Sequence, residues 1–127
     1  MAQKQYVTWD EVDKFVNEVV QAYKGAPLSG VYGLPRGGLI LAVMISNRLR
    51  IPMLTAPCEH CLIVDDICDT GESLIHYVKD SSAEEKPCWD IITMFYKENE
   101  LNIHPTIYKY KKEDKWIVFP WEEKEEV

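Results

Sequence analysis

Hydrophobic residues recur along the chain with two different spacings, which predict helices and strands in alternation. The stretch TWDEVDKFVNEVVQAY gathers its apolar residues on one helical face: Val12, Phe15, Val16, Val19, Val20 and Tyr23. Thr8 and Glu11 have the spacing of a capping box, so we expect this helix to begin just after Thr8. A second helix is expected at about residues 39–49, after the glycine-rich stretch PRGG.

Short apolar and β-branched runs predict strands between and after these helices. They are GVYGL, IPMLTAP, residues 62–65, CWDIITMFY, PTIYKY and KWIVF. The run at residues 62–65 lacks alternation and is therefore expected to be buried on both faces, and SLIHYVK after it returns to a helical pattern. The polar turn KKED between the last two runs predicts a terminal β-hairpin.

Strands that alternate with helices predict an α/β fold. We expect a parallel sheet with helices on both faces and a small C-terminal β-hairpin or hood. The length of 127 residues suits one hydrophobic core, so residues 1–127 are expected to form a single domain. In such sheets, ligands bind beyond the carboxyl ends of the strands.

The stretch LIVDDICDTGES crowds acids and a glycine around one predicted strand end. Asp65 and Asp66 end the strand, and DTGES then falls at the amino end of a predicted helix, where free amides and the helix dipole attract anions. Gly71 permits close approach of a phosphate, and the hydroxyls of Thr70 and Ser73 can donate to it. The carboxylates would repel a phosphate unless they bind ribose hydroxyls or a hard cation such as Mg²⁺. The stretch therefore predicts a site for a phosphorylated sugar and a metal ion rather than a solvated acidic turn.

The charge and composition of the chain disfavour some classes of binding partner and of cellular location. Fourteen basic and twenty-one acidic side chains give a net charge of -7, which disfavours nonspecific binding to nucleic acid or to an anionic membrane. The longest apolar run, residues 39–45, is too short to span a bilayer, and the amino terminus lacks the apolar core of a secretory signal. We therefore expect a cytoplasmic protein with reduced cysteines. The CEHC stretch, which holds Cys58, His60 and Cys61, lacks the second ligand pair of a structural zinc site.

Several motifs, in order, resemble the type I phosphoribosyltransferase family. LIVDDICDTGES looks like the family's signature for 5-phosphoribosyl 1-pyrophosphate (PRPP), and YGLPRGG resembles its pyrophosphate loop. FYKENE, KWIVFPWE and YVTWDEV are similar to stretches of the bacterial xanthine-guanine and hypoxanthine (6-oxopurine) branch. The resemblance runs from about Tyr6 to Glu122, nearly the whole chain.

The resemblance implies a role for each matching residue. Asp69 and Arg36 would be catalytic, Mg²⁺ would be the cofactor and Asp66 its ligand, and the peptide bond entering Arg36 would be cis. The PRPP and phosphate site would comprise Arg36, Gly37, Asp65, Asp66, Ile67, Cys68, Asp69, Thr70, Gly71, Glu72 and Ser73. The base site would comprise Asp69, Lys97, Trp116 and Ile117, with Trp116 stacking on the purine and Lys97 donating to its 6-oxo group.

The sequence also departs from the family pattern at two places. Only seven residues, TAPCEHC, precede the signature, where family members usually carry a longer mobile hairpin, and Glu72 stands where the xanthine-guanine enzymes commonly have glycine. The predicted function is transfer of phosphoribose from PRPP to guanine, xanthine or hypoxanthine in purine salvage, by a homo-oligomer, either a dimer or a tetramer. The alternative is a sensor or regulator on the same fold that binds PRPP or a nucleotide without turnover.

Overall fold

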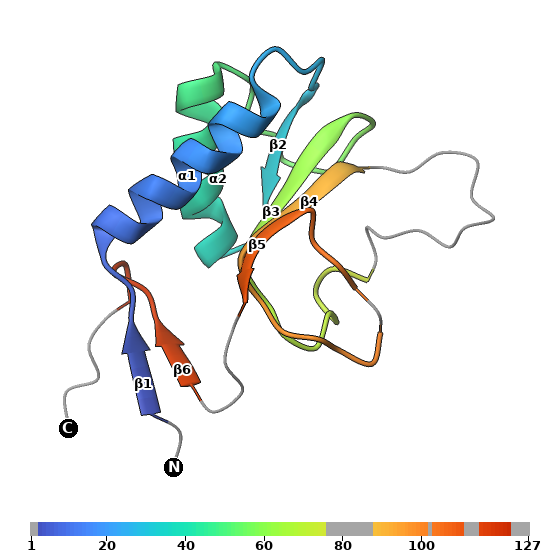
Figure 1. Ribbon diagram of the computed structural model, residues 1–127. Helices are drawn as coiled ribbons and strands as arrows, with labels where there is room; N and C mark the ends of the chain where they lie inside the picture. Colours follow the sequence, from blue (N-terminus) through green and yellow to red (C-terminus); the bar gives the residue numbers. More distant parts are fainter. Residues whose placement is uncertain (1–2, 76–87, 102, 111–114, 123–127) are drawn as a thin grey trace.

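A computed structural model describes residues 3–75, 88–101, 103–110 and 115–122 (Figure 1). Its elements are β1 (Gln3–Tyr6), α1 (Trp9–Tyr23), β2 (Gly30–Gly33), α2 (Gly37–Leu49), β3 (Cys61–Cys68), β4 (Cys88–Tyr96), β5 (Ile107–Tyr110) and β6 (Lys115–Val118). Four strands form a parallel sheet in the order β2-β3-β4-β5, and β1 pairs with β6 in a separate parallel sheet. The predicted α/β fold with a parallel sheet is confirmed.

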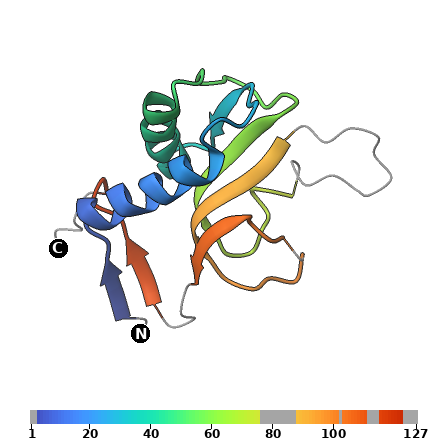
Figure 2. The same ribbon diagram turned by 45° about the horizontal axis from the view of Figure 1, so that its top comes forward.

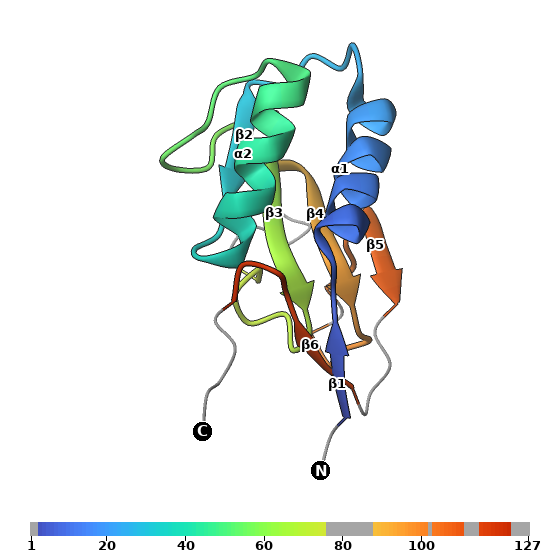
Figure 3. The ribbon, with the colours of Figure 1, turned by 90° about the vertical axis from the view of Figure 1, so that its left-hand side faces the viewer.

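Both described helices cover the same face of the four-stranded sheet (Figure 3). Helix α1 begins as predicted, because the hydroxyl of Thr8 accepts a hydrogen bond from the amide of Glu11 at 3.1 Å. The apolar faces of α1 and α2 pack with alternate residues of β3 and β4 in one core, which includes Phe15, Leu41 and Leu62.

The opposite face of the sheet carries a smaller core, formed with the loops that follow β3 and β4. Ile63 and Tyr96 from the strands meet Leu74 and Ile103 from those loops. Strand β3 is therefore buried on both faces, as its unbroken apolar run predicts. Of the segment SLIHYVK, for which a helix is expected, residues 73–75 form a turn, and residues 76–79 lie outside the described residues.

Three strand predictions need correction. The run IPMLTAP forms only an isolated bridge between Met53 and Val31 rather than a strand. Strand β3 continues three residues beyond the predicted end, to Cys68. The predicted terminal hairpin is wrong, because β5 pairs with β4 whereas β6 pairs with β1, beside the large sheet (Figure 2). A strand-like pattern indicates an extended segment but does not identify the strand with which it pairs. Here β6 pairs with the amino-terminal strand β1.

The described residues contain no helix that is both long and apolar enough to cross a membrane.

Candidate active site

The parallel sheet brings three separate parts of the sequence to one edge. Strands β2, β3 and β4 are adjacent and parallel, so their carboxyl ends lie together. The Arg36 loop follows β2, the acids lie in the last four residues of β3 and just after it, and Lys97 follows β4 directly (Figure 1). This edge is where ligands bind in open α/β sheets.

The loop after β2 packs directly on the acids of β3. The amide of Leu34 donates to the carbonyl of Val64 at 2.8 Å, and the Pro35–Arg36 peptide bond is cis, which confirms that expectation. A Cβ atom at Gly37 would collide with the carboxylate of Asp66. A side chain at residue 37 would therefore force the Asp66 carboxylate out of its present position against the Arg36 loop.

Asp65 and Asp66 form a pair of carboxylates with different surroundings. Asp65 is buried, and its Oδ1 accepts a hydrogen bond from the amide of Asp66 at 2.8 Å, whereas Asp66 is half-buried. Burial, together with the negative charge of Asp66, raises the pKa of Asp65 to about 8. A cation or a set of hydroxyl donors at the pair would relieve this repulsion and favour the ionised form of Asp65.

The remaining residues of the signature form a turn at the end of β3. Gly71 has a φ of +85°, in the left-handed region that favours glycine, and its carbonyl accepts hydrogen bonds from the amides of Leu74 and Ile75. The hydroxyl of Thr70 accepts from the amide of Glu72 at 3.3 Å, and Thr70, Glu72 and Ser73 are exposed. The loop thus presents the hydroxyl-bearing residues Thr70 and Ser73 to solvent, where an anion could reach them.

Two signature residues face inward instead. The side chain of Cys68 is buried, its thiol donates weakly to the carbonyl of Ile103 at 3.9 Å, and burial raises the pKa of this thiol to about 11. Ile67 is half-buried and packs against the main core. Neither side chain is placed as a phosphate ligand, so contact with PRPP at these positions would have to come from the backbone.

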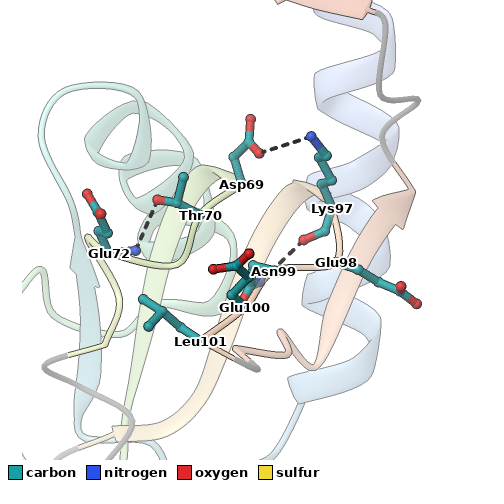
Figure 4. Close-up of a pocket in the computed structure, with 8 residues that line it drawn as sticks. All are labelled: Asp69, Thr70, Glu72, Lys97, Glu98, Asn99, Glu100 and Leu101. Atoms are coloured by element: carbon teal, nitrogen blue, oxygen red, sulfur yellow. Dashed lines mark hydrogen bonds and ion pairs between the residues drawn. The ribbon is translucent and has the colours of Figure 1, made fainter.

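A cavity of about 560 Å³ lies between the loop after β3 and the loop after β4 (Figure 4). Its lining residues are Asp69, Thr70, Glu72, Lys97, Glu98, Asn99, Glu100 and Leu101. Across it, the ammonium of Lys97 lies 3.9 Å from the carboxylate of Asp69. Lys97 supplies the one cationic side chain in a lining with four acids, so a polyanionic ligand would need a counterion here.

The other two predicted base-binding residues lie on β6, outside the cavity lining. The side chain of Trp116 is 62% exposed, whereas that of Ile117 is buried in the main core. Trp116 can therefore stack on a ligand, while Ile117 could contact one only through its backbone. The structure places Asp69 and Lys97 at one cavity, and neither Trp116 nor Ile117 is among the residues that line it.

The short connection before β3 lies at the far edge of the sheet. Ser29 precedes β2, and its amide donates to the carbonyl of His60 at 2.9 Å, while its hydroxyl donates to the carbonyl of Glu59 at 2.6 Å. These bonds hold residues 59 and 60 at the amino ends of β2 and β3, opposite the cavity. This connection cannot cover the site as a longer hairpin would.

Sequence reasoning missed Asn99, which lines the cavity and bridges several backbone groups. The available signal was an asparagine two residues after Lys97, just past a strand, since asparagine side chains commonly hydrogen-bond to nearby backbone in turns.

Comparison with known proteins identifies the family. No protein-family model matches the chain. The crystal structure of a purine phosphoribosyltransferase from Pyrococcus horikoshii is 32% identical, with a TM-score of 0.77 over 98% of both chains. Xanthine-guanine phosphoribosyltransferases of Chromohalobacter salexigens and Idiomarina loihiensis are 26% and 23% identical; they cover 91% and 92% of this chain and 82% and 86% of their own lengths. A xanthine-guanine-hypoxanthine phosphoribosyltransferase from Helicobacter pylori, 17% identical with a TM-score of 0.67, shares the fold. This chain belongs to the type I phosphoribosyltransferase family and is similar to its 6-oxopurine members.

Proposed function

We propose that this protein transfers the 5-phosphoribosyl group from PRPP to a 6-oxopurine base and releases pyrophosphate. The bond from the anomeric carbon to a pyrophosphate oxygen breaks, and a bond from that carbon to a purine nitrogen forms. The observation that carries the proposal is the contact of Gly37 with Asp66, in a chain 32% identical to a purine phosphoribosyltransferase. That contact makes one continuous surface from the Arg36 loop and the acids of β3, as a single PRPP molecule requires.

The parts of PRPP fit different parts of this surface. The 5-phosphate would bind the hydroxyls and amides of residues 69–73, and the ribose hydroxyls would donate to Asp65 and Asp66. Arg36 and the amide of Gly37 would hold the pyrophosphate. Negative charge develops on the leaving group as its bond breaks, so Arg36 would stabilise the transition state more than the ground state.

The donor set also fits a magnesium ion. Carboxylate oxygens are the ligands that Mg²⁺ prefers, and the exposed part of the Asp65–Asp66 pair provides them. Within the described residues, no three side chains of His, Cys, Asp or Glu gather around one point, so Asp66 would share the ion with water and ligand oxygens. Bound there, Mg²⁺ would neutralise negative charge on the pyrophosphate.

Lys97 and Asp69 would recognise the base between them. Lys97 would donate to the 6-oxo group, and Asp69 would accept the proton that the imidazole ring of the purine releases, a general-base role commonly worth ~10² to 10⁴ in rate. Trp116 would stack on the ring, with the backbone of Ile117 beside it. An amino group at carbon 6 would leave the Lys97 ammonium without an acceptor, which disfavours adenine.

The proposal also covers the binding partners, the location and the oligomeric state of the protein. The net charge of -7 disfavours nucleic acid and an anionic membrane surface as partners, and an anionic ligand would need local positive charge or a bound cation. The proposed location is the cytoplasm. The position of residues 59 and 60, far from the cavity, favours a homo-oligomer in which a second copy covers the site and limits hydrolysis of PRPP.

A turnover assay tests the function. Wild-type protein with PRPP, Mg²⁺ and guanine, xanthine or hypoxanthine should form the corresponding nucleotide, and Asp69→Asn and Arg36→Ala should each lower the rate strongly. Thr106→Val, near the amino end of β4 and away from the cavity, is the matched control and should keep the rate. PRPP binding by calorimetry without product from any of the three bases would overturn the transferase and leave the sensor. The enzyme names of the relatives favour turnover.

A further inference from the structure

The side chain of Asn99 makes a two-bond bridge to the backbone of Ile103. Its Oδ1 accepts from the amide of Ile103 at 2.9 Å, and its Nδ2 donates to the carbonyl of Ile103 at 3.0 Å. The same Nδ2 lies 3.3 Å from the carbonyl of Lys97 and 3.8 Å from the sulfur of Cys68. Asn99 is half-buried, so these bonds are partly shielded from competing water.

This bridge lies where the loops after β3 and β4 touch. Ile103 is buried, and a Cβ atom at Gly71 would lie 2.6 Å from its Cγ1 and 3.3 Å from the Oδ1 of Asn99. Gly71 belongs to the proposed phosphate loop. The position of Asn99 therefore determines how closely the two loops pack.

The backbone of Lys97 is held on both sides by this junction. Its amide donates to the carbonyl of Cys68 at 2.8 Å, and its carbonyl accepts from Asn99 (Figure 4). Asp69 follows Cys68 directly, and its carboxylate lies 3.9 Å from the Lys97 ammonium. The lysine side chain is long and flexible, so the place of its ammonium depends on a fixed backbone.

We propose that Asn99 is a positioning residue that holds the Lys97 backbone relative to Asp69 and so sets the preference for a 6-oxo over a 6-amino purine. The inference rests on the proposed function, because it takes Lys97 and Asp69 as the two groups that read the base. The 6-oxo group accepts a hydrogen bond from an ammonium, whereas the amino group donates and cannot. Discrimination requires the ammonium to stay within hydrogen-bond reach of carbon 6 while Asp69 faces the imidazole ring.

The test compares Asn99→Ala, Asn99→Asp and Thr106→Val with the wild type. Asn99→Asp keeps the acceptor for the Ile103 amide but loses the donor contacts of Nδ2 to the carbonyls of Ile103 and Lys97 and to the sulfur of Cys68. Thr106→Val removes a loop hydrogen bond, 2.9 Å to Asp90, near the amino end of β4 and away from the cavity. The readout is the inhibition constant of 2,6-diaminopurine divided by the KM of guanine, since these bases differ only in the group on carbon 6 and in the hydrogen that guanine carries on the adjacent N1.

Both Asn99 variants should lower this ratio about tenfold, and Thr106→Val should leave it unchanged. A purely structural role would reduce the active fraction for both bases alike and would not alter the ratio. An unchanged ratio in Asn99→Ala, or an equal fall in Thr106→Val, would overturn the inference.

Hydrogen exchange in the ligand-free protein separates this inference from the proposed function. The amides of Lys97 and Ile103 should exchange faster in Asn99→Ala than in the wild type, and Thr106→Val should not change them. If the wild type transfers phosphoribose to no 6-oxopurine, the proposed function fails, and the base-selection role of Asn99 fails with it. Faster exchange would then still support the positioning of Lys97, whereas unchanged exchange of Lys97 would refute it whatever the enzyme assay shows.

Discussion

Replacing Asp65 with asparagine should change how the stability of the protein depends on pH. The pKa of this buried carboxyl is raised from 3.8 to about 8, first by burial and then by the charge of Asp66. Between these values the folded protein keeps a proton that the unfolded chain has released. The free energy of unfolding therefore falls as pH rises from about 4 to about 8, and the contribution of the protonated form is fully present only below that window.

The magnitude follows from the raised pKa. At about 1.4 kcal/mol per pKa unit, a rise from 3.8 to about 8 corresponds to a loss on the order of 6 kcal/mol above pH 8. Asparagine has nearly the same shape, carries no charge at any of these pH values, and keeps an oxygen to accept the Asp66 amide. Asp65→Asn should therefore gain stability relative to the wild type as pH rises, by several kcal/mol between pH 5 and pH 9.

Urea unfolding of both proteins at pH 5, 6, 7, 8 and 9, with EDTA present to remove divalent ions, measures this difference. Asp10→Asn is the control, because it makes the same substitution at an exposed side chain on the first turn of α1. A constant difference between Asp65→Asn and the wild type would refute the raised pKa and the repulsion that we infer between the two acids.

Three further substitutions test separate parts of the molecule. Gly37→Ala should push the Asp66 carboxylate away and lower kcat/KM by ~10²-fold or more while circular dichroism keeps its helical signal; wild-type turnover would contradict the need for contact between the Arg36 loop and β3. Trp116→Ala should weaken binding of guanosine monophosphate in calorimetry by ~1 to 3 kcal/mol, and an unchanged affinity would rule out stacking. Thr8→Ala removes the cap on the Glu11 amide and should cost ~1 kcal/mol in urea unfolding with no change in KM, so a large change in KM would show that α1 affects the site.

The sequence predicted the local elements well where hydrophobic periodicity was strong. Helix α1 and strand β4 occupy the expected residues, because each has a long pattern and clear boundaries. The pairing of β6 could not be predicted, since its short pattern is compatible with either β5 or β1 as a neighbour. Partner choice depends on long-range packing that a local pattern does not contain.

The sequence predicted the candidate site only where its residues are close together along the chain. Asp65, Asp66 and the residues up to Ser73 are consecutive, so a short motif describes them, and Arg36 lies in a motif of its own. Asn99 lies in the motif FYKENE, but that motif did not reveal its role, because the role depends on Ile103 and on contact with Gly71, which lies in another loop. The inward orientation of Cys68 and Ile117 likewise became clear only from their burial.

The parallel order of β2, β3 and β4 explains why residues far apart in the sequence could bind one ligand. It also explains why residues 59 and 60 do not cover the site. Each parallel strand starts at one edge and ends at the other, so the loops after the three strands converge while the connection into β3 returns to the starting edge. Hydrogen bonds from Ser29 hold residues 59 and 60 at that starting edge, so this connection does not lie over the cavity. The loop after β4, held to Gly71 through Asn99 and Ile103, is then the part of the described structure best placed to limit access of water to the reacting groups.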